Sequence, residues 1–584
     1  MVISAIICAA ISAIISAVLS ATIPLSSLPP RATNPVMQPL LLPTPRRCEI
    51  RPGRAAADAP IRLIEDRSLP PQGYRLEIDP HEVRLAHADA SGRRHGEATL
   101  AQLPDRPCLR IDDAPAFAVR GVMLDVSRDR VPTLEELLRL VDQLAAWKVN
   151  HLQLYVEHVF AYRGHREVWE PWSPLTHEDI ATLAARCAAR GIDLAANQNC
   201  LGHLARWFRL PAYAAMAEMA PGEPWDFNGL AAMKGPFSLC PSDPRSLPFV
   251  RGLLEEMLPC FPSRLANIGC DEAFDLGQGR SREVVARRGR AAVYLEWVRE
   301  VAGIVRGLGK QPQFWADIAL EDPESLGELP EDLVALCWGY EPDAPFARWV
   351  EQVRGVGRSP WVCPGTSCWR TWTARTTERR ENLLAAARED ADGFLATAWG
   401  DLGHRQPWPV TLHGLAEAAH RAWSGTAPFD PRSSGRFAFG AEALGAWLDE
   451  LGDADRSLRV LARRRNASEL FVDMHRPWAE PAPGDAAAYE EVGGTLDRLA
   501  GSMPAGDSLV EEELRSGLAF ASLAARRGAI RRATPADHAA RRALARPLRE
   551  AIDARRSLWT RRARPGGLES SLAHDLAVLA DLEA

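Results

Sequence analysis

Eight short apolar segments, separated by amphipathic helical stretches, constrain the fold of this chain more than any other feature of its sequence. Such runs are typical of parallel strands that are buried on both faces. The eight segments are Val122–Val126, His151–Val156, Asp193–Gln198, Leu265–Cys270, Gln313–Ile318, Val334–Trp338, Trp361–Thr366 and Phe394–Trp399. Eight strand–helix repeats predict an α/β fold with a closed (β/α)8 TIM barrel. An open doubly wound sheet is the alternative, but no glycine-rich phosphate loop follows the first strand.

Regions of different pattern flank the barrel, which is predicted over residues 117–425. Residues 37–116 combine short alternating segments, a polar turn at Asp89–Gly92 and a helix near Glu97–Leu103, which predicts a small α+β domain. A linker rich in Pro, Ser and Gly follows the barrel at 427–435. The region that contains it, 426–584, has helical periodicity and predicts a helical C-terminal domain.

Residues 1–36 are an apolar leader or a mis-assigned extension. Val2–Ile23 has no charge and is long enough for a signal peptide or a membrane span. No basic residue precedes it, however, and Met37 is an alternative start. The eleven scattered cysteines fit a reducing compartment and favour a cytoplasmic protein starting near Met37. The other reading is export, with a membrane partner only if the leader is retained.

Composition excludes several classes of function. The net charge is −7 and no basic block stands out, so a nucleic-acid partner has no electrostatic support. The cysteines show no metal-type spacing and the histidines no HxH or HExxH pattern, so we expect no metal and no cofactor. The chain has 18 Trp but only 7 Tyr, and an indole face is suited to stacking on a sugar ring.

Polar side chains gather where the predicted strands end, which is where barrel enzymes place their catalytic groups. They are Asp125, Arg128, Glu157, His158, Asn197, Gln198, Asn199, His203, Asp271, Glu272, Trp315, Asp317, Trp338, Tyr340, Ser367, Trp369, Trp399 and Asp401. The fourth strand is the most specific, because Asn267-Ile-Gly-Cys-Asp-Glu272 is an apolar run that ends in two acids. Adjacent strand side chains point to opposite faces, so both acids can enter one pocket only if the backbone turns there. Crowded acids raise the pKa of at least one, as a general acid requires.

These motifs resemble glycoside hydrolase family 20, the β-N-acetylhexosaminidases. Asn267–Glu272 is similar to the family signature His/Asn-hydrophobic-Gly-Gly-Asp-Glu, and Arg120–Arg128 to its first-strand motif. Gly202-His203 and the strand ends at Trp315 and Trp399 resemble further motifs, in the right order. The resemblance covers about residues 40–425 and includes Gly73–Ile78 of the small domain.

The resemblance implies a retaining exo-β-N-acetylhexosaminidase that acts through an oxazolinium intermediate. Glu272 would be the general acid and base, and Asp271 would stabilise the charge that develops on the acetamido group. Arg120 would bind the outer hydroxyls of the terminal sugar, and Asp401 a distal hydroxyl. Glu157 and His203 would support the acid, and Trp315, Trp338 and Trp399 would wall the pocket. The partner is a carbohydrate that carries an amino sugar.

The chain departs from the family pattern at several strand ends. Cys270 replaces the second glycine of the signature, and Glu157-His158 stands where an Asp-Asp pair is usual. The third-strand segment Asn197–His203 lacks its usual acid, and Gly365–Trp369 lacks the Tyr-X-Asp that grips the acetamido carbonyl. Tyr340 and Ser367 are candidates for that role.

Because of these departures, the sequence does not determine which sugar and which linkage the protein recognises. Two alternative functions also remain. One is a barrel glycosidase for a modified or internal amino sugar. The other is a non-catalytic carbohydrate-binding barrel, although such a barrel usually loses the acid, and here Asp271 and Glu272 both persist.

Overall fold

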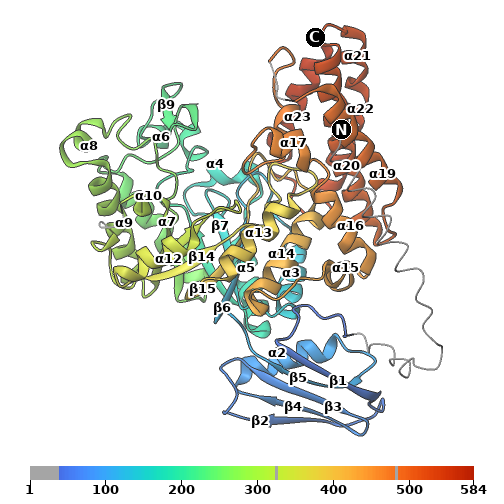
Figure 1. Cartoon of the computed structure of the whole chain (residues 1–584). Coiled ribbons are helices and arrows are strands. Elements are labelled where there is room, and N and C mark those ends of the chain that lie inside the picture. Colours follow the sequence, from blue (N-terminus) through green and yellow to red (C-terminus); the bar gives the residue numbers. More distant parts are fainter. Residues whose placement is uncertain (1–37, 323–325, 481–483) are drawn as a thin grey trace, which may run out of the picture. The chain divides into compact units, whose positions relative to one another are not determined.

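The computed structural model describes residues 38–322, 326–480 and 484–584, and Leu40–Ala584 form one compact unit (Figure 1). The apolar leader predicted for residues 1–36 lies outside the described residues. Within the described ranges, every helix is too short or too polar to cross a membrane. The division into three further domains stays a prediction, and the elements are given below region by region.

A five-stranded sheet precedes the barrel, in the order β1-β5-β3-β4-β2. Its strands are β1 (Arg47–Arg54), β2 (Ile61–Glu65), β3 (Tyr74–Asp79), β4 (Glu82–His87) and β5 (Pro107–Asp113). Helix α2 (Ala90–Ala101) lies across one face (Figure 1). Burial alternates along β3 and β4, because only the side chains facing α2 enter the core.

The predicted turn at Asp89–Gly92 is the first turn of α2. The Asp89 side chain accepts a hydrogen bond from the Gly92 backbone N–H and so caps the helix. The helix therefore begins at Ala90 rather than near Glu97. An aspartate followed by small polar residues favours a helix start as strongly as it favours a turn, since both use the same side-chain acceptor.

The predicted closed barrel is confirmed, with the strand order β11-β12-β13-β14-β15-β6-β7-β8. All pairs are parallel, for example β6 with β7 and β15 with β6. The strands are β6 (Val119–Asp125), β7 (His151–Val156), β8 (Asp193–Gln198), β11 (Leu265–Asn267), β12 (Gln311–Trp315), β13 (Val334–Trp338), β14 (Ser359–Cys363) and β15 (Gly393–Ala398). Nearly every strand residue is buried, as expected when helices cover the outer face and side chains fill the interior.

Amphipathic helices cover the barrel. They are α3 (Leu134–Ala146), α4 (Arg166–Trp169), α5 (His177–Arg190), α6 (Pro211–Ala214), α7 (Ser246–Met257), α8 (Arg282–Arg288), α9 (Arg290–Gly307), α10 (Asp317–Glu321), α12 (Phe346–Gly355), α13 (Thr376–Ala387) and α14 (Trp408–Ser424), with 3-10 turns η1 (Glu170–Trp172), η2 (Trp207–Arg209) and η3 (Leu258–Cys260). The Thr133 hydroxyl caps α3 by accepting from Glu136 N–H. A hairpin of β9 (Pro224–Phe227) and β10 (Ala231–Lys234) is inserted between β8 and α7.

Helices make up the rest of the chain. They are α15 (Pro431–Phe439), α16 (Glu442–Gly452), α17 (Arg456–Leu461), α18 (Glu469–Met474), α19 (Ala486–Gly501), α20 (Ser508–Ala533), α21 (His538–Ala543), α22 (Ala545–Trp559) and α23 (Leu568–Glu583). The predicted linker at 427–435 is partly helical, because α15 begins at Pro431 and is capped by Asp430. Proline is well suited to a first helical position, where no backbone donor is needed.

A buried polar cluster joins the small sheet to the amino-terminal end of the barrel. Lys148 Nζ contacts Asp113 Oδ2 at 3.1 Å and donates to Tyr74 OH at 2.9 Å. The Trp423 indole also donates to Asp113, at 2.9 Å, and its ring lies 4.3 Å from Lys148 Nζ. Lys148 and Asp113 are almost completely buried, so neither charge has water as a substitute partner.

The ten described cysteines are free thiols, and eight of them are buried. They are distributed over the small sheet and the barrel region rather than paired at an interface. Burial raises the pKa of each of them.

Replacing Lys148 with methionine should lower the free energy of unfolding by about 3 kcal/mol, because it leaves the Asp113 carboxylate buried without its cation. Urea or thermal unfolding followed by circular dichroism measures the change. Lys234, which is exposed in β10, provides the matched control Lys234→Met with little effect. Equal stability of the two variants would show that the buried pair contributes nothing.

Candidate active site

The strand that carries the two acids ends early and turns sharply. β11 stops at Asn267, three residues before the predicted end, and Gly269 and Cys270 have left-handed backbone angles, with φ of 68° and 69°. A side chain at Gly269 would meet Asn199 at 2.6 Å, so glycine is required there. Asn199 also accepts the Cys270 N–H at 3.2 Å and holds the turn. The turn breaks the strand alternation that would have sent the two acids to opposite faces.

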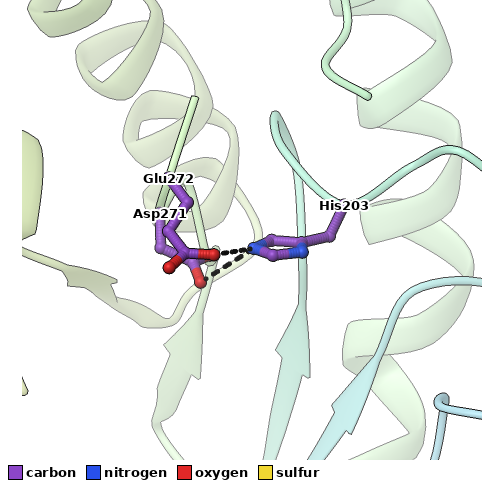
Figure 2. Close-up of side chains that lie close together, drawn as sticks. All are labelled: His203, Asp271 and Glu272. Carbon is purple, nitrogen blue, oxygen red and sulfur yellow. Dashed lines mark ion pairs between the residues drawn. The ribbon is translucent and has the colours of Figure 1, made fainter. Parts of the chain in front are cut away.

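Asp271 and Glu272 consequently converge on one histidine (Figure 2). Asp271 Oδ2 lies 3.2 Å and Glu272 Oε2 3.3 Å from His203 Nε2. Asp271 is buried, whereas the Glu272 side chain keeps 28% of its surface exposed. The two acids therefore share one site, with Glu272 the more accessible of the pair.

The Asp271 carboxylate is held in place by a hydrogen bond and an ion pair. Its Oδ1 accepts from Asn199 Nδ2 at 2.7 Å. Burial would raise the pKa of Asp271, but the charge and hydrogen bond of His203, followed by Arg128, outweigh burial and lower it. This carboxyl is therefore ionised at neutral pH.

Glu272 is positioned through its backbone. Its N–H donates to Asp317 Oδ2 at 2.9 Å, and Asp317 Oδ1 accepts from Trp338 Nε1 at 3.2 Å. Burial, reinforced by the negative charges of Asp271 and Glu272, raises the pKa of Asp317 well above its usual range. Asp317 therefore joins the Glu272 backbone to the Trp338 indole through its two oxygens.

His203 lies between the two acids and Arg128. Burial alone would lower its pKa, but Asp271 and the hydrogen bonds of both acids raise it to about 10. On the other side of the ring, Arg128 lies 3.3 Å from Nδ1 and opposes this protonation. The imidazole thus couples the acid pair to the arginine.

Arg128, and not Arg120, is the arginine of the site. Its guanidinium contacts Asp125 at 2.9 Å, Glu157 at 3.5 Å and Asp401 at 3.7 Å. It also lies over the Tyr155 and Trp399 rings, at 5.0 and 4.8 Å.

The expectation that Arg120 binds sugar hydroxyls is wrong. Arg120 is at the amino-terminal end of β6, buried, and donates to Lys148 O at 2.8 Å, Phe117 O at 2.8 Å and Gln72 Oε1 at 3.0 Å. Barrel strands point their carboxyl ends at the catalytic face, so the start of β6 faces the small sheet instead.

The predicted aromatic residues form one cluster beside the acids. Its members are Trp315, Trp338, Tyr340, Trp369 and Trp399. Trp338 stacks on Tyr340 with ring centres 5.2 Å apart, and the Tyr340 hydroxyl accepts from Trp399 Nε1 at 2.7 Å. Trp315 and Trp369 are at most 2% exposed, so they pack behind the other rings. Trp338 is only partly buried and is more accessible to solvent.

Tyr155 belongs to the site but was not identified from the sequence. Its hydroxyl donates to Glu157 Oε1 at 3.0 Å and accepts from Asn199 Nδ2 at 3.3 Å. The sequence feature that could have identified it is its position two residues before Glu157, because side chains two residues apart in an extended chain point to the same side.

The ligand atoms of His203, Asp271 and Glu272 lie within 4.8 Å of one another, close enough in principle for a metal ion. Two features favour an ion pair instead. The imidazole bridges both carboxylates through one nitrogen, and the Arg128 guanidinium 3.3 Å from the other nitrogen repels a further cation.

Comparison with known proteins agrees with this geometry. The model of "Glycosyl hydrolase family 20, catalytic domain" matches residues 117–352. The chain is 28% identical over 311 residues to the beta-hexosaminidase of Akkermansia muciniphila, covering 47% of this chain and 61% of that protein. It is 26% identical to the beta-N-acetylhexosaminidase of Cellulomonas fimi, covering 53% of this chain and 62% of that protein. The chain thus spans about three fifths of the length of these relatives.

Solved structures show the same fold at lower identity. The crystal structure of a beta-N-acetylhexosaminidase superposes with a TM-score of 0.55 and 21% identity, covering 69% of this chain and 94% of that one. The chitobiase of Flavobacterium johnsoniae gives a TM-score of 0.56 and 17% identity, covering 92% of this chain and 99% of that one.

The raised pKa of His203 predicts a pH-dependent contribution to stability. A group whose pKa is higher in the folded state stabilises fully below its unfolded pKa, about 6.5, and loses that contribution as pH rises through about 10. The difference in free energy of unfolding between the wild type and His203→Asn should therefore shrink steadily over that range. Urea unfolding at a series of pH values measures it, and a difference that grows with pH would contradict the assignment.

Proposed function

The chain is a divergent member of glycoside hydrolase family 20, and from this premise we propose that it is a retaining exo-β-N-acetylhexosaminidase. Its substrates would be glycans or glycoconjugates that end in β-linked GlcNAc or GalNAc. The observation that carries the proposal is the convergence of Asp271 and Glu272 on His203, beside the aromatic wall of Trp338, Tyr340 and Trp399.

The first chemical step needs an acid that can reach the leaving group. Glu272 is the more accessible of the two acids, so it protonates the glycosidic oxygen as the bond to C1 breaks. The carbonyl oxygen of the sugar's own 2-acetamido group attacks C1 and forms the oxazolinium, which replaces an enzyme nucleophile. Water then attacks C1 from the leaving side and Glu272 takes its proton, while the bond between C1 and the acetamido oxygen breaks and restores the 2-acetamido group.

Asp271 supports the intermediate rather than attacking it. Because Asn199 and His203 hold its carboxylate in place and keep it ionised, its charge is available without reorganisation when the acetamido group becomes positive. Preorganised charge of this kind in a buried site is usually the largest single contribution to catalysis.

The remaining site residues would recognise the sugar. Arg128 and Asp401 meet at the carboxyl ends of β6 and β15 and carry the donors and acceptors that outer hydroxyls need. Tyr340, whose hydroxyl already accepts from Trp399, is placed to donate to the acetamido carbonyl in the absence of a tyrosine from the seventh strand. This mechanism uses no cofactor.

A panel of chromogenic aryl β-glycosides tests the function directly. GlcNAc or GalNAc glycosides should be hydrolysed, and a thiazoline analogue of the intermediate should bind far more tightly than substrate. Equal cleavage of β-glucosides without the acetamido group would contradict substrate-assisted catalysis. Binding of the sugar without hydrolysis would instead indicate the non-catalytic barrel.

Substitution of the two acids should separate their roles. Glu272→Gln should lower kcat by roughly 100-fold to 10,000-fold, the range of general acid–base catalysis, with the melting temperature unchanged. Asp271→Asn should lower kcat roughly 100-fold to 1,000-fold through loss of preorganised charge. An activated aryl leaving group should restore much of the Glu272→Gln rate, because it needs no proton, and should not restore that of Asp271→Asn.

The first-strand motif contains two arginines, and substitution of one serves as the control for substitution of the other. Arg128→Lys keeps the charge but loses the multiple contacts, so KM should rise about tenfold or more. Arg120→Lys should leave kcat and KM near wild type and lower the melting temperature, since its partners belong to the small sheet and the barrel floor. Kinetics on the aryl glycoside with thermal unfolding distinguishes them, and the reverse pattern would restore Arg120 to the sugar site.

A further inference from the structure

A small cavity lies between the barrel loops and the C-terminal helices, separate from the acid pair. Its volume is about 50 Å³. Arg130 comes from the loop after β6, Arg405 from the loop after β15, and Arg555 from α22. Trp372 and Trp559 supply aromatic walls. Three arginines from distant parts of the sequence therefore line one confined space.

The lining carries three arginines and one acid, Glu513, whose negative charge also acts on Arg130. Arg405 and Arg555 share a single carboxylate, that of Asp575. Glu513, the acid among the lining residues, is bonded to Arg562 at 2.8 Å. Arg130 makes no hydrogen bond or ion pair with any described residue, and its guanidinium lies 5.9 Å from the centre of the Trp559 ring.

Polar atoms without a partner belong to the same lining, and they include the acceptors Glu513 Oε2 and Gln406 Oε1 as well as two donors. Arg405 Nε and Trp372 Nε1 are buried and have no partner in the protein. The two side chains are 4% and 2% exposed, so bulk water does not replace that partner. An unsatisfied buried donor costs roughly 1–3 kcal/mol, which an acceptor placed in the cavity would recover.

We propose that this cavity binds a tetrahedral oxyanion, inorganic phosphate or sulfate. The cavity has room for a group of several heavy atoms. Guanidinium groups recognise oxyanions through several parallel N–H donors; Arg130 has a free guanidinium of this kind, and Arg405 Nε and Trp372 Nε1 each add one donor.

The anion would connect the cavity to the sugar site. Arg130 follows Arg128 by two residues on one loop, and Gln406, another lining residue, donates to Trp399 O at 2.9 Å on the other. Binding would fix both loops against α20 and α22, which also line the cavity. Arg128 and Trp399 would then be held in place from behind.

Thermal unfolding without substrate tests the site on the full chain. Phosphate and sulfate should raise the melting temperature by several degrees in a saturable way, while sodium chloride at matched ionic strength should not. Arg130→Met should weaken the apparent affinity for phosphate at least tenfold, and Arg130→Lys less. Arg561→Met, an exposed neighbour in the same helical region, should bind phosphate like the wild type.

Each other result would count against the proposal. Equal effects of chloride and phosphate would show general screening, and unchanged phosphate binding in Arg130→Met would place the anion elsewhere. If only an anionic group on a glycan, and no free anion, stabilised the protein, the cavity would be a substrate subsite instead. Because this readout needs no hydrolysis, it stands or fails independently of the proposed function.

Discussion

The left-handed turn after β11 is the constraint on which the site depends. A regular strand would send Asp271 and Glu272 to opposite faces, whereas positive φ at Gly269, Cys270 and Glu272 brings them to one histidine. A residue other than glycine in this conformation costs roughly 1–2 kcal/mol, so neighbouring groups must hold it. Asn199 accepts the Cys270 N–H, and the Tyr294 hydroxyl of α9 donates to Cys270 O at 3.0 Å. The strain is thus offset by contacts from the preceding strand and the following helix.

Three consecutive charged side chains in the loop after β6 contact three different parts of the protein. Arg128 enters the site of the acid pair, Asp129 accepts from Arg206 at 2.7 Å, and Arg130 reaches the cavity beside α22. One short loop therefore links the acid pair, the segment after β8 and the C-terminal helices. This arrangement gives those helices, in which the sequence shows no chemistry, a structural connection to the catalytic face.

Periodicity and strand ends were enough to predict the barrel and the acid pair, since both are local properties of a few residues. Arg128 was placed at a strand end, but the binding role was given to Arg120, because both occupy one motif and only the bounds of β6 tell which end of the barrel each occupies. The starts of α2 and α15 were missed because Asp89 and Asp430 are acceptors for turns and helix caps alike. The cavity could not be predicted at all, because Arg130 and Trp559 meet only through tertiary packing.

The buried cysteines affect whether this protein can recover after it unfolds. The thiolate is the reactive form of cysteine, and burial keeps eight of the ten described thiols protonated and out of reach of oxidants. Unfolding removes that protection from all eight at once. Disulfide formation in the unfolded state would then compete with refolding, and to that extent heat inactivation would depend on time rather than on an equilibrium alone.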